Sequence, residues 1–64
     1  MRISIRAART NKGLTQAEAA TALNVTKKTV CSWEKYRTKP SVDKVEKICD
    51  LYDVEYDDIK WNAN

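Results

Sequence analysis

The feature that most constrains this chain is a very short connection between two stretches that favour helix. Asn24 suits the left-handed conformation of a turn residue, and Val25 can fill the angle between two helices that cross there. Thr26 is a favourable N-cap for the helix that follows. The sequence therefore predicts a pair of short, steeply crossed helices over about residues 15–35.

Further capping signals divide the chain into five short helices. Gly13 suits the end of the first, Thr15 and Glu18 match the capping box that starts the second, and Ser41 caps the fourth. The helices are predicted over residues 3–12, 16–23, 27–35, 42–51 and about 55–61, so the fold class is all-α. Residues at helical spacing in the fourth helix are predicted to enter the core: Val42, Val45, Ile48, Cys49 and Leu51.

The length of the chain limits the size of its core. At 64 residues it is expected to form one domain over residues 1–64. A chain this short buries only about 60% of the surface that its unfolded form exposes. With 42% hydrophobic and 33% charged residues, one Gly and one Pro, the composition is typical of a compact helical protein. So small a core favours association with a second copy.

Several function classes lack the residues that they require. The chain has no His, no glycine-rich phosphate loop and no Ser or Cys beside a plausible base, so we expect no enzyme. Cys31 and Cys49 are too few for a disulfide framework and are not spaced as metal ligands, which predicts reduced thiols, no metal and no cofactor. No small-molecule ligand is indicated. The sequence also lacks an apolar run of membrane-spanning length and a signal-peptide pattern, so we expect the chain in the cytoplasm.

Charge is distributed unevenly along the sequence. Residues 1–41 hold nine Lys and Arg and two acids, a net charge of +7, whereas residues 42–64 hold three Lys and seven acids, a net charge of −4. The overall net charge of +3 therefore hides a strongly basic part that suits a polyanion. Charge alone also fits ordinary solvated helix faces, so other features have to decide between the two.

The basic residues of the third predicted helix fit the chemistry of DNA. Lys27 and Lys28 are adjacent, and they lie on the side opposite Val30 and Trp33. Lys can bind O6 and N7 of guanine in a major groove that is about 12 Å wide and admits one helix. The residues predicted to contact phosphates flank this pair: Arg9, Gln16, Lys35, Arg37 and Lys39.

A series of short motifs follows in a specific order and spacing. They are Gly13-Leu14-Thr15-Gln16-Ala17-Glu18-Ala19-Ala20, Leu23-Asn24-Val25-Thr26, Val30-Cys31-Ser32-Trp33-Glu34, Pro40-Ser41, and Val54 followed by Ile59. Together they resemble the phage-repressor helix-turn-helix family of Cro and Xre type. The resemblance covers about residues 3–60. Each motif is common by itself, but the set is specific.

This resemblance implies a helix-turn-helix unit over about residues 15–35, in which the second helix lies in the major groove. Four residues match positions that read bases: Thr26, Lys27, Lys28 and Ser32. Gln16 matches a residue that meets the phosphate backbone, while Arg9 and Glu34 match a structural ion pair between the first and third helices. The resemblance assigns the following residues to the core: Leu14, Ala20, Leu23, Val25, Val30 and Trp33.

Three positions depart from the family pattern. Lys35-Tyr36 stands where Asn-Gly is usual, and Tyr is unfavourable at a position that needs a positive φ. Ala19 replaces a usual Leu, which leaves a gap unless Trp33 or Met1 fills it. Glu55 replaces the usual Ser or Thr cap of the last helix, so that helix is expected to fray.

The C-terminal segment 52–64 is a candidate for dimerisation. Tyr56, Ile59 and Trp61 form either a cover over the first helix or, as we expect, a dimer seam. The predicted function is a sequence-specific DNA-binding transcriptional regulator, a phage or prophage-like repressor that binds a pseudo-palindromic, double-stranded operator as a homodimer. The alternatives are an antitoxin or anti-repressor module that docks on a protein partner through the acidic segment, and a nucleic-acid binder without sequence preference.

Overall fold

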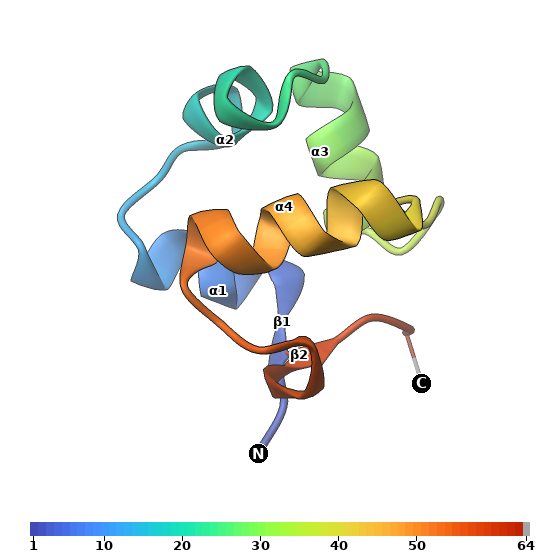
Figure 1. Ribbon diagram of the computed structural model, residues 1–64. Coiled ribbons are helices and arrows are strands. Elements are labelled where there is room, and N and C mark those ends of the chain that lie inside the picture. Colours follow the sequence, from blue (N-terminus) through green and yellow to red (C-terminus); the bar gives the residue numbers. More distant parts are fainter. Residues whose placement is uncertain (64) are drawn as a thin grey trace.

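In the computed structural model, which describes residues 1–63, four helices pack around a shared core (Figure 1). They are α1 (Ile5–Asn11), α2 (Gln16–Leu23), α3 (Lys27–Glu34) and α4 (Val42–Tyr52). A 3-10 turn, η1 (Tyr56–Asp58), follows α4. Two short strands, β1 (Ile3–Ser4) and β2 (Ile59–Lys60), pair with each other. The expected mainly helical fold is therefore confirmed.

The N-caps predicted at Thr15, Thr26 and Ser41 are present in the structure. The Thr15 hydroxyl accepts a hydrogen bond from the Glu18 N–H at 3.1 Å, and the Glu18 carboxylate accepts one from the Thr15 N–H at 2.9 Å. Thr26 caps α3 by accepting from the Thr29 N–H, and Ser41 caps α4 in the same way. These bonds satisfy backbone donors that a helix leaves free at its N-terminus.

Each of the four α-helices is followed by a residue with left-handed backbone. The four residues are Gly13, Asn24, Tyr36 and Asp53, with φ of 77°, 58°, 59° and 57°. In each case its N–H and the next N–H bond back to carbonyls of the last helical turn, which is the Schellman arrangement. Gly, Asn and Asp tolerate this conformation, but a bulkier L-residue pays about 1–2 kcal/mol. Tyr36 adopts it nevertheless.

The two ends of the chain differ from the all-helical prediction. Ile3 and Ser4, expected in the first helix, pair in parallel with Ile59 and Lys60. The Ser4 hydroxyl accepts a hydrogen bond from the Ala7 N–H at 3.0 Å, so α1 begins only at Ile5. The fifth helix is reduced to η1 because Ile59 and Lys60 are extended and pair with β1.

The core lies between the helices and the β1–β2 pair. Its buried residues are Ile5, Ala8, Ala19, Leu23, Trp33, Ile48, Tyr52 and Ile59. Ala19 is 0% exposed and belongs to the same cluster as Trp33. Met1 is fully exposed, so it does not fill the space beside Ala19. The small side chains of α2 thus allow the large Trp33 ring into the centre of the domain.

Helix α4 buries only part of the set of residues expected in the core. Val42 is 77% exposed, so its prediction as a core residue is wrong. Ile48 and Tyr52, four residues apart, are 1% and 3% exposed, while Val45, Cys49 and Leu51 are half-buried. Val42 is the first residue of α4 and points away from the Ile48–Tyr52 side of the helix, because successive residues turn by about 100°. No helix within residues 1–63 is long and apolar enough to cross a membrane.

Candidate nucleic-acid interface

One side of α3 is buried and the other is open. Val30 and Trp33 are 1% and 5% exposed and fix the helix against the rest of the domain. Lys27, Lys28 and Lys35 lie on the opposite side and are all exposed. The hydrophobic contacts of α3 thus orient its lysines outward, where they can reach a polyanion.

The turn before α3 sets the angle of this helix. Asn24 adopts left-handed backbone as predicted, and the Val25 N–H bonds to the Ala20 carbonyl at 2.9 Å. Val25 is half-buried and packs against the core. Thr26 is exposed, and its hydroxyl lies 2.9 Å from that of Thr29 while it caps the helix. Thr26, Lys27 and Lys28 are therefore together at the exposed start of α3.

Ser32 is the fourth residue predicted to read bases, and its surroundings differ from those of the other three. It is half-buried, and its hydroxyl lies 2.9 Å from the hydroxyl of Thr38. Thr38 belongs to the loop that leaves α3, and sequence reasoning did not identify it. No local pattern signals a pair of hydroxyls six residues apart across a helix end.

The loop after α3 extends the basic surface. Arg37 and Lys39 are exposed, as is Thr38 between them. The Arg37 N–H bonds to the Ser32 carbonyl at 3.0 Å, which holds the start of the loop against the last turn of α3. Five cations thus follow one another along the helix and its exit: Lys27, Lys28, Lys35, Arg37 and Lys39.

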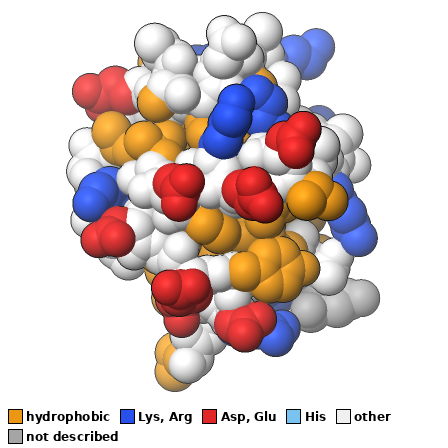
Figure 2. All heavy atoms as spheres, in the orientation of Figure 1, with side chains coloured by type: hydrophobic (Ala, Val, Ile, Leu, Met, Phe, Trp, Pro, Cys, Tyr) orange, Lys and Arg blue, Asp and Glu red, His pale blue; other side chains and the backbone are white. Residues whose placement is uncertain are grey.

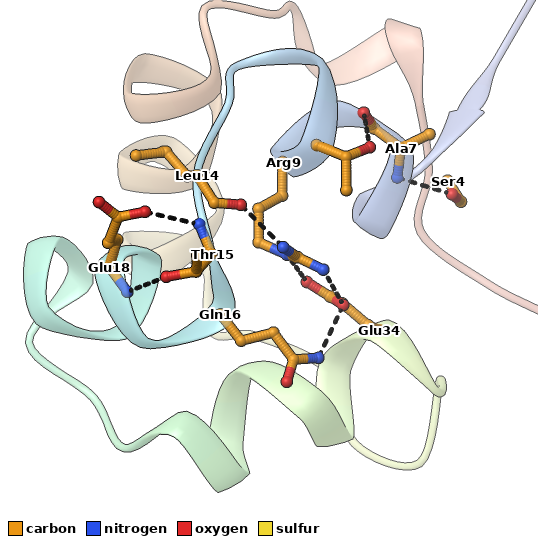
Figure 3. Close-up of polar contacts among 9 residues, drawn as sticks. Ser4, Ala7, Arg9, Leu14, Thr15, Gln16, Glu18 and Glu34 are labelled. Carbon is orange, nitrogen blue, oxygen red and sulfur yellow. Dashed lines mark hydrogen bonds and ion pairs between the residues drawn. The ribbon is translucent and has the colours of Figure 1, made fainter.

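The only acid among residues 26–40 is Glu34, and it is turned inward (Figure 3). Arg9 Nε donates to Glu34 Oε2 at 2.6 Å, and Arg9 Nη2 donates to Glu34 Oε1 at 3.2 Å. Arg9 Nη1 donates to the Leu14 carbonyl at 2.8 Å, and Gln16 Nε2 donates to Glu34 Oε1 at 3.0 Å. The Arg9 and Glu34 side chains are 9% and 4% exposed. This cluster joins α1, α2 and α3.

The same cluster perturbs the protonation equilibria around it. The hydrogen bond to Glu34 raises the pKa of Arg9 above its ordinary value. Burial, with the nearby charge of Glu34, raises the pKa of Tyr52 to about 12. The Arg9 shift follows mainly from its hydrogen bond to a carboxylate, and the Tyr52 shift mainly from burial of the phenol, which disfavours its charged form.

Two of the residues expected to bind phosphate lie differently from the others. Arg9 is 7% exposed and its guanidinium donates to Glu34 and Leu14, which fits the ion pair expected for it and leaves little of the side chain for a phosphate. Gln16 is half-buried at the start of α2, with one amide N–H used by Glu34. Its position at a helix N-terminus still suits an anion, because free N–H groups and the helix dipole meet there.

Arg6 adds an exposed cation of α1 to the basic surface. An open groove of about 610 Å³ runs between α1, the start of α2 and α3, and its lining includes Arg6, Gln16, Lys27 and Lys35 together with the paired Arg9 and Glu34. Arg6 and Arg9 are three positions apart and share one side of α1. The sequence therefore indicated the correct side of α1. It did not show that Arg6 is exposed to solvent while Arg9 turns inward.

The face formed by α4 and the C-terminal segment carries the opposite charge. Figure 2 shows carboxylates gathered there around an apolar patch. Tyr56 is 59% exposed and stacks on Trp61, with ring centroids 5.5 Å apart, while Trp61 Nε1 donates to the Tyr56 carbonyl at 2.9 Å. Ile59 is 1% exposed, so the expectation that it lies on an exposed seam is wrong: its pairing with Ile3 in β1 carries it into the core.

Comparison with known families gives one result. Residues 5–59 match a family model described as helix-turn-helix, which spans all four helices and η1. The matched range includes the crossed pair α2 and α3 and the basic loop that follows them. Comparison with curated proteins and with solved structures gives no match.

Proposed function

Because the chain belongs to the helix-turn-helix family of Cro and Xre type, a non-enzymatic family of DNA-binding domains, we propose that it is a phage-type transcriptional repressor. It binds a pseudo-palindromic operator with α3 in the major groove. It acts where the DNA of a bacterial or phage-infected cell lies, in the cytoplasm.

The observation that carries this proposal is the uninterrupted basic surface of α3 and its exit loop. Lys27, Lys28, Lys35, Arg37 and Lys39 are all exposed, while Glu34 is buried in the cluster with Arg9. The only carboxylate of residues 26–40 is therefore paired with a cation. Neutralising the phosphates of duplex DNA releases bound counterions, which supplies much of the affinity of such proteins.

The residues of this surface have different tasks. Thr26, Lys27, Lys28 and Ser32 read base edges, because the start of a recognition helix enters the groove first. Phosphates are contacted by Gln16 at the start of α2 and by residues around the exit of α3, namely Lys35, Arg37 and Lys39. Arg6 is added to this second group, since it lines the same groove as Gln16.

Two copies bind the two halves of the operator. Their recognition helices stand about 34 Å apart, which is one turn of DNA. The contact between copies uses Tyr56 and Trp61, the two members of the expected seam that remain accessible at the surface. Burial of this aromatic stack offsets the small core of each copy.

One observation favours a second candidate, a module that docks on a protein partner as an antitoxin or anti-repressor does. An open groove of about 930 Å³ lies between α4 and the C-terminal segment. Its lining combines exposed apolar side chains, Val42 and Tyr56, with carboxylates such as Glu46 and Asp50. Such a surface repels DNA and suits a basic, partly apolar protein segment.

A mobility-shift titration separates these candidates. Labelled DNA from the region upstream of the protein's own gene is compared with random DNA of equal length at several salt concentrations. The repressor proposal expects at least tenfold tighter binding to the upstream DNA. Equal affinity for both DNAs would leave a nucleic-acid binder without sequence preference, and no binding to either would favour the protein-partner module.

A further inference from the structure

Tyr36 occupies a backbone conformation that its side chain disfavours. Its φ of 59° is close to those of Asn24 and Asp53, 58° and 57°, which end α2 and α4 in the same way. Asn and Asp are residue types that tolerate left-handed backbone, because their short polar side chains can hydrogen-bond locally, whereas a Tyr ring has no such local partner. The ring must therefore be held by contacts elsewhere in the fold.

These contacts join the end of α3 to the C-terminal strand β2. The Tyr36 hydroxyl donates to the Lys60 carbonyl at 2.8 Å, across a separation of 24 residues. The ring is half-buried and packs against the core cluster. Lys60 lies in β2, which is itself paired with β1. Tyr36 is thus bound to the C-terminal segment of the chain.

The segment that Tyr36 starts is the basic exit loop. The Tyr36 N–H bonds to the Trp33 carbonyl at 3.0 Å and the Arg37 N–H bonds to the Ser32 carbonyl at 3.0 Å. The Thr38 hydroxyl then meets that of Ser32 at 2.9 Å. One side of the loop is therefore attached to α3, and its first residue is attached to β2.

We infer that Tyr36 is a positioning residue for phosphate binding, which acts through Arg37 and Lys39. Its bond to Lys60 holds the exit loop in one place before DNA arrives, so fewer conformations are lost when the two cations meet the backbone of the duplex. The inference rests on the proposed DNA binding and adds a residue that itself touches no DNA.

The first test is Tyr36→Phe, which keeps the ring and removes only the hydroxyl. Its affinity should fall about three- to tenfold for upstream and random DNA alike, and the salt slope should become shallower by up to about one unit, because a phosphate contact weakens. Tyr52→Phe is the matched control: it removes a hydroxyl from a core residue outside the interface and should leave both quantities unchanged at a temperature where all variants are folded.

A second substitution separates the turn from the anchor. Tyr36→Asn supplies a residue that this chain already uses in left-handed backbone, at Asn24, but it has no ring to reach β2. The end of α3 should remain intact by circular dichroism while DNA affinity falls as in Tyr36→Phe. Wild-type affinity in Tyr36→Asn would overturn the inference.

A double-mutant cycle shows whether Tyr36 acts through the loop. In a chain that carries Arg37→Ala and Lys39→Ala, the further change Tyr36→Phe should leave DNA affinity unchanged, because its effect requires those cations. An equal loss in both backgrounds would contradict a positioning role.

Amide hydrogen exchange gives a readout that needs no DNA. In Tyr36→Phe the amides of Arg37 and Thr38 should exchange faster than in the wild type, while that of Val30 in the middle of α3 should be unchanged. Unchanged exchange in the loop would refute the anchor even if the wild type binds DNA well. A wild type that binds no DNA would instead refute the proposed function, and this inference with it.

Discussion

Glu34→Gln tests the buried cluster that joins the first three helices. The substitution keeps the shape of the side chain but removes its charge and turns one acceptor oxygen into an amide donor. In the wild type Glu34 accepts from two Arg9 nitrogens and from Gln16. After the substitution at least one of these N–H groups faces another donor, and the Arg9 charge has no counterion.

The structure sets the size of the expected effect. The side chains of Arg9 and Glu34 are 9% and 4% exposed, so solvent replaces little of the lost interaction. Removing one partner of such a buried pair costs about 3–5 kcal/mol. We take about 3 kcal/mol, since the polar Gln retains some hydrogen bonding. For a domain of about 60–100 residues, 1 kcal/mol corresponds to about 4–8 °C in Tm, so the midpoint should fall by more than about 10 °C.

Thermal and urea unfolding followed by circular dichroism measure this loss. Asp53→Asn is the matched control, because it removes the charge from the exposed ion pair of Lys12 and Asp53, 3.9 Å apart, and Asn also tolerates left-handed backbone. That change should alter the free energy of unfolding by less than about 1 kcal/mol. A Tm for Glu34→Gln as close to wild type as that of the control would show that the cluster does not stabilise the fold.

Three further outcomes are expected. Lys28→Ala should cost about 1–3 kcal/mol on the operator and little on random DNA, whereas Lys39→Ala should weaken both and reduce the salt slope by about one unit; the reverse pattern in a titration against salt would mean that α3 does not enter the groove as proposed. Trp61→Ala should raise the dimer dissociation constant in sedimentation, and a monomer in both wild type and variant would mean that Trp61 only covers its own core. The pKa of Tyr52, raised to about 12, means that the folded state favours the neutral phenol, so this contribution is complete below about pH 10 and is lost as the pH rises through about 12. Urea midpoints at pH 9 and pH 11.5 should therefore differ less in Tyr52→Phe than in the wild type, and an equal fall in both would contradict the burial of this hydroxyl.

The sequence alone determined the features that depend on residues a few positions apart. The caps at Thr15, Thr26 and Ser41 and the left-handed turns at Gly13 and Asn24 were predicted correctly, because each is decided by hydrogen bonds within one helical turn. Charge and apolar spacing along α3 also gave its outward basic side, since a helix converts sequence spacing directly into direction. The fold class and the crossed pair of helices followed from these local signals.

Local sequence patterns did not reveal several contacts between residues far apart in the chain. The pairing of Ile3 with Ile59 buries a residue expected on the surface, and the bond of Tyr36 to Lys60 holds a turn that local preference opposes. The family resemblance implied the Arg9–Glu34 pair, but spacing in α1 alone did not show that Arg9 turns inward while its neighbour Arg6 stays exposed. Such contacts join residues 24 or more positions apart, and they form because the packed helices bring polar groups into a poorly solvated space where each needs a partner. Helical spacing says which way a side chain leaves its own helix, and it contains no information on what the rest of the fold has placed there.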